Sequence, residues 1–127
     1  MFKIRKEQLD ALSQASLKGF EERMVVHLNK FFQPQCRPLG EVKVREWIHY
    51  GIQRAKSYGI ISERDVCKYI DLMFAFGRDF DKDRNYSLAL QILTDEEITD
   101  PTQRINKLFD TALERLRQAA AAEGAKV

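Results

Sequence analysis

The sequence predicts an all-α protein, a four- to five-helix bundle in a single domain. Three observations support this fold class. Apolar residues recur at intervals of three and four in several separate segments, and turn-forming residues divide these segments from one another. No alternating apolar run is long enough to build a sheet. With 127 residues, 44% of them hydrophobic, the chain is large enough to bury one core.

The first helix is expected from about Lys6 to Phe32. Its apolar stripe consists of Leu9, Leu12, Phe20, Met24, Leu28 and Phe31, with Ser16 as a small exception. The segment from Gln33 to Gly40 contains Pro34 and Pro38. Because proline lacks the backbone N–H and clashes with the preceding turn, we expect the helix to stop here and the segment to form a loop.

Two further helices follow this loop. The second has the apolar stripe Val44, Trp47, Ile48, Gly51, Ala55 and Tyr58. It should end at Gly59 in a left-handed cap, and Gly51 should permit close packing of a neighbouring helix. Ser62 is the expected N-cap of the third helix, with Asp65 three residues later as a weaker form of the capping box. Since the third helix carries Val66, Tyr69, Ile70, Met73 and Phe74, it should be the most buried.

The remaining chain starts with a polar loop from Gly77 to Tyr86. The apolar run 88–93 predicts one or two helical turns, and Thr94 with Glu97 should cap another turn. Asp100 followed by Pro101 predicts the start of the last helix, which continues to Leu116. The bundle therefore spans residues 5–117. The alanine-rich tail, residues 118–127, has no apolar stripe and should fray.

Charge and cysteine content exclude several classes of protein. The chain has 21 Lys and Arg and 19 Asp and Glu, and the two signs of charge are interspersed along it. It therefore lacks the basic cluster that would predict nucleic-acid binding. No apolar run approaches the roughly 18 residues of a membrane span, and the basic start of the chain is not followed by the apolar core of a signal peptide. Cys36 and Cys67 belong to no metal or redox motif. We expect a cytoplasmic protein with reduced thiols and no membrane contact.

Two patterns resemble metal sites without completing one. Glu46 and His49 form a Glu-x-x-His pair, but a di-iron bundle needs two such pairs and two more glutamates. Asp79, Asp81, Asp83 and Asn85 alternate like the start of a calcium loop. That motif then requires glycine where the chain has Arg84 and glutamate where it has Leu90. We therefore expect a solvated loop with Asx turns and no metal.

Enzymatic chemistry is not predicted either. The chain has no glycine-rich phosphate loop, no Gly-x-Ser-x-Gly motif and no recognisable Cys–His pairing. We expect a non-enzymatic protein with no catalytic residue and no cofactor.

A DNA-binding alternative comes from the segment between Ala55 and Ile70, which resembles a helix-turn-helix. The turn is one residue too long, because Ile61 precedes Ser62. The would-be recognition helix also carries Glu63, Asp65 and Asp71, whose charges would repel phosphates. These two features count against DNA binding. Because of the resemblance to a helix-turn-helix, a DNA-binding regulator is kept as an alternative to a protein-binding role.

Five short runs carry a resemblance to a known group of proteins. They are YGIQRA at 50–55, YGI at 58–60, SERDV at 62–66, YIDLM at 69–73 and FGRDFD at 76–81. With them, residues 5–117 resemble small, uncharacterised bacterial proteins encoded beside effector, adaptor and spike genes of type VI secretion loci. That group often has Pro-Trp-Ala after the acidic loop, where this chain has Tyr86-Ser87-Leu88-Ala89.

The resemblance implies a function but no functional residues. It implies an accessory, such as a chaperone or co-chaperone, that holds or regulates a secreted toxin or its adaptor. The expected partner is therefore another protein, and a toxin-neutralising immunity protein is an alternative role.

The predicted partner surface combines the loop from Arg78 to Tyr86 with the outward side of the second helix. Aromatic and arginine side chains supply most of the binding energy at protein interfaces, and loops on rigid scaffolds commonly carry function. The candidate residues are His49, Tyr50, Arg54, Arg78, Phe80, Arg84 and Tyr86. For Phe80 a second interpretation stays open, in which its ring folds back to cover the end of the third helix.

Overall fold

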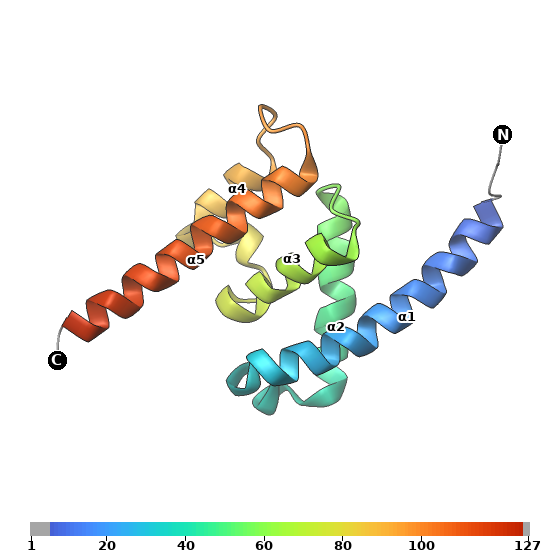
Figure 1. Ribbon diagram of the computed structural model, residues 1–127, viewed down its shortest axis with the longest axis horizontal. Helices are drawn as coiled ribbons and strands as arrows, with labels where there is room; N and C mark the ends of the chain where they lie inside the picture. The colour runs from blue at the N-terminus through green and yellow to red at the C-terminus, as the bar shows by residue number, and fades with distance from the viewer. Residues whose placement is uncertain (1–5, 126–127) are drawn as a thin grey trace. The chain divides into compact units, whose positions relative to one another are not determined.

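The computed structural model describes the backbone of residues 6–125 and the side chains of residues 16–122. This part of the chain contains five α-helices, two short 3₁₀ helices and no strand (Figure 1). The helices are α1 (Lys6–Phe31), α2 (Gln33–Ser57), α3 (Glu63–Phe76), η1 (Phe80–Lys82), η2 (Arg84–Tyr86), α4 (Ser87–Leu93) and α5 (Pro101–Ala125). The predicted all-α fold class is confirmed.

The chain divides into two compact units, and the division lies inside α2. The N-terminal unit extends to His49, and the C-terminal unit begins at Tyr50. The predicted limits of the bundle domain, residues 5–117, stay a prediction. In the predicted tail, α5 continues as a helix to Ala125.

In the N-terminal unit, α1 buries a shorter stripe than the sequence predicts. Phe20, Met24 and Leu28 are buried, whereas Phe31 is 61% exposed at the end of the helix. The stripe therefore ends one turn early. The predicted positions Leu9 and Leu12 lie outside the residues whose side chains are described.

The expected loop after α1 is helical, so that prediction is wrong. Helix α2 begins at Gln33, and its first turn includes Pro34, where a missing N–H costs no helical hydrogen bond. The N–H of Cys36 donates to the carbonyl of Phe32 over 3.0 Å. The actual break comes at Gly40, whose φ of 78° is a left-handed value that favours glycine. Pro38 precedes this kink and removes a donor only from a short helical segment.

In the C-terminal unit, α2 ends at Ser57, and Gly59 forms the left-handed cap that the sequence predicts. This residue has a φ of 79°, and the N–H of Ile60 donates to the carbonyl of Ala55 over 2.9 Å, which closes a Schellman cap. Gly51 allows close packing against α3. A Cβ there would lie 2.7 Å from Ile70 Cγ1 and 2.7 Å from Met73 Sδ.

Local caps also define α3 and α5. The Ser62 side chain accepts a hydrogen bond from the N–H of Asp65 over 3.3 Å, as the sequence predicts. The Asp65 carboxylate does not complete a capping box, because it accepts from the hydroxyl of Thr102 over 2.6 Å. Asp100 Oδ1 accepts from the N–H of Thr102 over 3.0 Å and thereby caps α5 at the predicted start.

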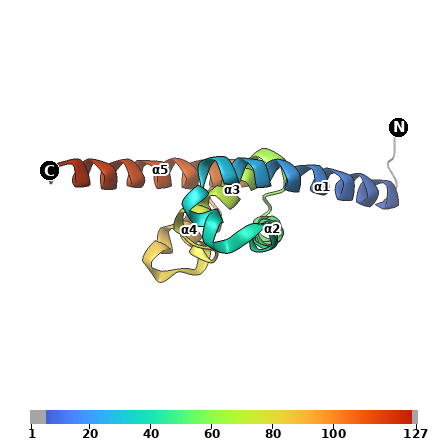
Figure 2. The same cartoon turned by 90° about the horizontal axis from the view of Figure 1, so that it is seen from below.

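The core of the C-terminal unit lies around α3. Helix α5 packs against both α3 and α4, and η1 contacts α3 and α4. Figure 2 shows α4 and the two 3₁₀ helices on one side of α5. The predicted stripe of α3 is buried, including Tyr69, Ile70 and Met73 at 0% exposure. No helix within residues 6–125 is both long enough and apolar enough to cross a membrane.

The predicted cap by Thr94 and Glu97 is wrong. Thr94 ends α4, and its hydroxyl donates back to the carbonyl of Leu90 over 2.7 Å. Asp95 takes the place assigned to Thr94, since its Oδ1 accepts from the N–H of Glu97 over 3.0 Å. The predicted turn is therefore present between α4 and α5, but as an Asx turn that Asp95 caps in place of Thr94.

Candidate functional site

A buried acid fastens the predicted partner loop to α2. The Asp81 side chain is 0% exposed, and its Oδ2 accepts a hydrogen bond from Nη2 of Arg54. The hydroxyl of Tyr58, one helical turn after Arg54, donates to the same oxygen over 2.6 Å. Burying a carboxylate is costly unless it is paired and hydrogen-bonded. Arg54 and Tyr58 therefore stabilise the inward position of Asp81.

Two tyrosines surround this ion pair in their neutral form. Burial, together with the hydrogen bond to Asp81, raises the pKa of Tyr58 to about 12. Burial and the nearby Asp81 charge also raise the pKa of Tyr69 above its ordinary value. The Tyr69 ring lies 5.1 Å from the ring of Phe80 and 6.2 Å from that of Tyr58. The buried inner side of the loop thus consists of aromatic rings packed around one charge pair.

A second cluster of interacting side chains lies at the start of the loop and is exposed to solvent. The guanidinium of Arg78 lies 4.8 Å from the ring centre of Tyr50, and the Tyr50 hydroxyl donates to Asp79 Oδ1. Arg78 Nη2 lies 3.3 Å from Asp79 Oδ2. The hydrogen bond from Tyr50 and the charge of Arg78 lower the pKa of Asp79, despite partial burial. Two predicted site residues, Tyr50 and Arg78, are therefore brought together and held by Asp79.

Two other predicted residues face inward. Phe80 is 3% exposed and packs against Tyr69, so it belongs to the core, as in the second interpretation of its role. Arg54 is directed to Asp81, which makes it a support of the loop instead of a surface contact. These two positions are corrections to the predicted partner surface.

The remaining predicted residues lie at three different places. Arg84 is exposed, and within residues 16–122 it forms no hydrogen bond or ion pair. Tyr86 is half-buried and packs edge-on against Phe76, with ring centres 5.1 Å apart. His49 belongs to the N-terminal unit, where its Nε2 lies 2.8 Å from Glu21 Oε1.

His49 is part of an acid-rich cluster around Arg45. The Arg45 guanidinium lies 2.8 Å from a carboxylate oxygen of Glu22, 3.0 Å from one of Glu41 and 3.6 Å from one of Glu21. The hydrogen bond from Arg45 lowers the pKa of Glu22. The observed partner of His49 is thus Glu21 on α1, whereas the Glu-x-x-His pattern in the sequence pairs His49 with Glu46.

The alternating acids of the loop diverge instead of forming a cage. Asp79 interacts with Tyr50, Asp81 points to Arg54, and Asp83 Oδ1 accepts from the N–H of Asn85 over 2.9 Å. The predicted Asx turn is therefore present at Asp83. The prediction of a solvated loop is wrong for Asp81. Arg54 and Tyr58 lie four residues apart on one face of α2, but nothing in that spacing indicates that Asp81, more than 20 residues later, is their partner.

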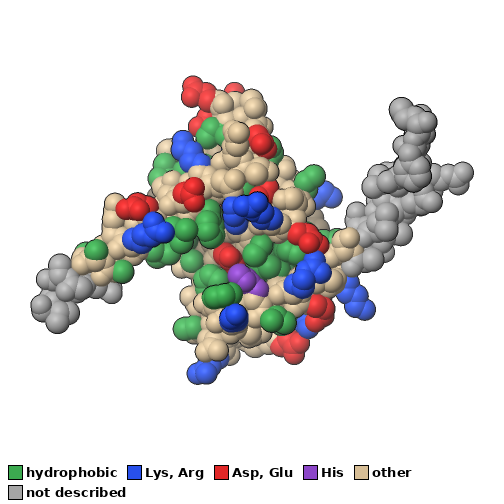
Figure 3. Space-filling view, in the orientation of Figure 1, with side chains coloured by type: hydrophobic (Ala, Val, Ile, Leu, Met, Phe, Trp, Pro, Cys, Tyr) green, Lys and Arg blue, Asp and Glu red, His purple; other side chains and the backbone are tan. Residues whose placement is uncertain are grey.

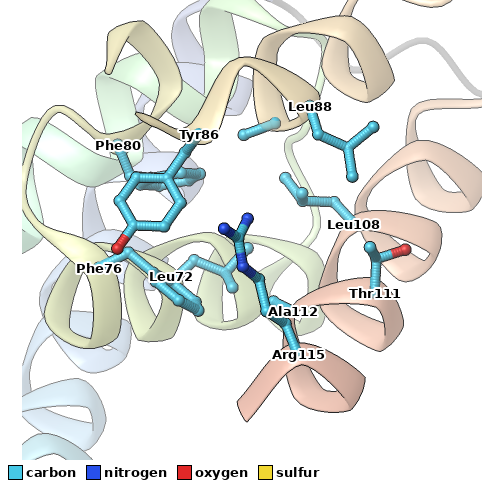
Figure 4. Close-up of a pocket in the computed structure, with 10 residues that line it drawn as sticks. Leu72, Phe76, Phe80, Tyr86, Leu88, Leu108, Thr111, Ala112 and Arg115 are labelled. Atoms are coloured by element: carbon cyan, nitrogen blue, oxygen red, sulfur yellow. The ribbon is translucent and has the colours of Figure 1, made fainter. Parts of the chain in front are cut away.

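An apolar pocket that the sequence did not predict opens between α3, α4 and α5 (Figure 4). Its cavity volume is about 40 Å³. The lining consists of Leu72, Phe76, Phe80, Tyr86, Leu88, Ala89, Leu108, Thr111, Ala112 and Arg115. Apolar side chains also reach the surface along α5, among charged ones (Figure 3). The predicted residue Tyr86 therefore belongs to a pocket as well as to the loop.

Helix α3, the recognition helix of the DNA-binding alternative, is engaged by α5. The Lys68 ammonium donates to Asn106 Oδ1, and Thr102 donates to Asp65. Two polar side chains of α3, Asp65 and Lys68, are thus already paired with α5 within the chain itself. Comparison of the chain with protein-family models, curated proteins and solved structures finds no match.

Proposed function

We propose that this chain is a non-enzymatic, cytoplasmic accessory that binds another protein through the loop from Arg78 to Tyr86. One observation carries the proposal. The loop is fastened from within by Asp81 and Phe80, while Arg78 and Arg84 remain exposed on it. A surface that is already ordered loses less conformational entropy on binding, and arginine is enriched at interface hot spots.

The resemblance to accessories of type VI secretion supports a partner of a specific kind. The partner is a secreted toxin or its adaptor, which the chain holds or regulates before export. The stacked pair of Tyr50 and Arg78 supports the same surface, because rigid aromatic and arginine side chains are typical anchors at interfaces. An immunity protein would use such a surface to neutralise the toxin itself.

The test is an affinity pull-down from the native bacterium, with the partner identified by mass spectrometry. The variant Arg78→Ala with Arg84→Ala removes two exposed charges from the loop. The matched control, Arg64→Ala with Lys107→Ala, removes the same charge from exposed positions elsewhere in the C-terminal unit. We expect the loop variant to recover at least fivefold less partner, and the control to recover as much as the unmodified protein.

Two outcomes would contradict the proposal. Equal partner recovery by the loop variant and the control would place the interface elsewhere, and recovery of DNA in place of a protein would favour the regulator. Circular dichroism and thermal unfolding of both variants show whether the fold is retained. Arg54 is unsuitable for this test, because its removal leaves the Asp81 carboxylate buried without its cation.

A further inference from the structure

We infer that the apolar pocket between α3, α4 and α5 receives one leucine-sized side chain of a partner segment that carries an acidic residue beside it. This inference rests on the proposed protein-binding function and specifies what the partner must present. It concerns a surface separate from the exposed arginines Arg78 and Arg84, since neither of them lines the pocket.

The size of the pocket indicates an aliphatic side chain. Its volume is about 40 Å³, and roughly 10–15 Å³ of such volume accommodates one water-sized group. About three or four such groups therefore fit, which corresponds to the branched end of leucine. The phenyl ring of a phenylalanine has about twice as many heavy atoms as the pocket accommodates and would require the walls to move apart.

The lining of the pocket favours an apolar occupant over water. Phe76, Leu88, Leu108 and Ala112 contribute carbon surfaces, and Leu88 at the rim is 44% exposed. A water molecule needs two to four polar partners to be held in a cavity, and this lining provides few. An inserted side chain would instead supply the van der Waals contacts that the pocket walls lack.

The charge at the pocket indicates an acid next to the apolar side chain. Arg115 extends from α5 toward Tyr86, and its guanidinium lies 5.5 Å from the ring centre of Tyr86 (Figure 4). Within residues 16–122 no carboxylate forms an ion pair with Arg115. The preceding acid, Glu114, lies 3.7 Å from Arg117 instead. A partner carboxylate would therefore meet a cation that lies over the Tyr86 ring and that no acid within residues 16–122 already pairs with.

The test is selection of a phage-displayed library of random 12-residue peptides on the full-length protein. We expect the enriched peptides to share a leucine with an aspartate or glutamate close to it in the sequence. A synthetic peptide of that consensus, labelled with fluorescein, then serves as the probe in fluorescence polarisation. Replacing its leucine by alanine should weaken binding at least tenfold.

Protein variants locate the peptide in the pocket. Ala112→Leu fills the cavity and should weaken binding at least tenfold, whereas the matched control Ala119→Leu, on an exposed position of the same helix, should leave it unchanged. Arg115→Glu should weaken binding at least fivefold, and a peptide with lysine in place of the acid should restore it. Lys107→Glu is the charge control and should have no comparable effect.

The inference is overturned by enriched peptides that lack either the leucine or the acid, by the absence of any enrichment, or by unchanged binding to Ala112→Leu. These failures are distinguishable from failure of the proposed function. If Ala112→Leu captures the native partner at full yield and the loop variant does not, the pocket inference fails and the protein-binding function stands. If the unmodified protein captures no partner, the proposed function fails whatever the peptides show.

Discussion

Arg54 on α2 donates a hydrogen bond to the fully buried carboxylate of Asp81, 27 residues later in the chain. This pair connects the polar loop after α3 to a helix that precedes it. Within residues 16–122, the second carboxylate oxygen of Asp81 has no hydrogen-bond partner. The stability of the inward loop therefore depends on Arg54 and Tyr58, the two residues that donate to the other oxygen.

Arg54→Ala should destabilise the protein by about 3–5 kcal/mol, because it leaves a buried charge without its partner. Chemical denaturation measures this loss. The double variant Arg54→Met with Asp81→Leu removes both charges and should lose less than the single variant, since no unpaired carboxylate remains. A loss below about 1 kcal/mol in the single variant would show that Asp81 does not stay buried and charged.

Gly51→Ala should destabilise the protein by about 1–3 kcal/mol, even though alanine favours helices. The added Cβ would lie 2.7 Å from Ile70 Cγ1 and from Met73 Sδ, and both of those side chains are fully buried. Gly19→Ala is the control, because its nearest neighbour is the flexible end of Arg23 at 3.2 Å. Equal effects of the two substitutions in urea denaturation would mean that α2 and α3 do not pack this closely at Gly51.

Alkaline pH should destabilise the native state through Tyr58. Its pKa is raised to about 12 in the folded protein, whereas an unfolded tyrosine has a pKa of about 10. Between these values the unfolded state has lost the proton that the native state keeps, so stability falls as pH rises.

Tyr58→Phe removes this titration and should reduce the loss of stability between about pH 10 and pH 12. Urea denaturation at several pH values measures the loss, and absorbance at 295 nm follows the formation of tyrosinate. The pKa values of Tyr50 and Tyr69 are also raised, so part of the loss should persist in the variant. An identical pH dependence in the variant and the unmodified protein would rule out this role of Tyr58.

Calcium should not raise the unfolding temperature. A ligand that binds only the native state must stabilise it, but Asp79, Asp81 and Asp83 point to different partners and would have to abandon them to form a cage. Differential scanning calorimetry with and without millimolar calcium checks this. An increase of several degrees that a chelator reverses would restore the calcium-loop hypothesis.

The sequence by itself determined the all-α class and several helix ends. Ser62, Gly59 and Asp100 were identified correctly because a cap depends on hydrogen bonds between residues only a few positions apart. The same local reasoning failed after α1, where two prolines predicted a loop. Pro34 lies in the first turn of α2, where proline is tolerated. The helix is broken only at Gly40, which has a positive φ.

Only the tertiary structure decided the environment of the candidate site. Phe80 and Tyr86 are both aromatics in a polar segment, yet Phe80 is buried against Tyr69, whereas Tyr86 is half-buried and packs edge-on against Phe76. Asp81 looks like its neighbours in the sequence but is buried, because Arg54 and Tyr58 are brought to it by folding. Burial of a charge and the shape of a pocket depend on residues far apart along the chain, and local spacing carries no information about which of them will meet.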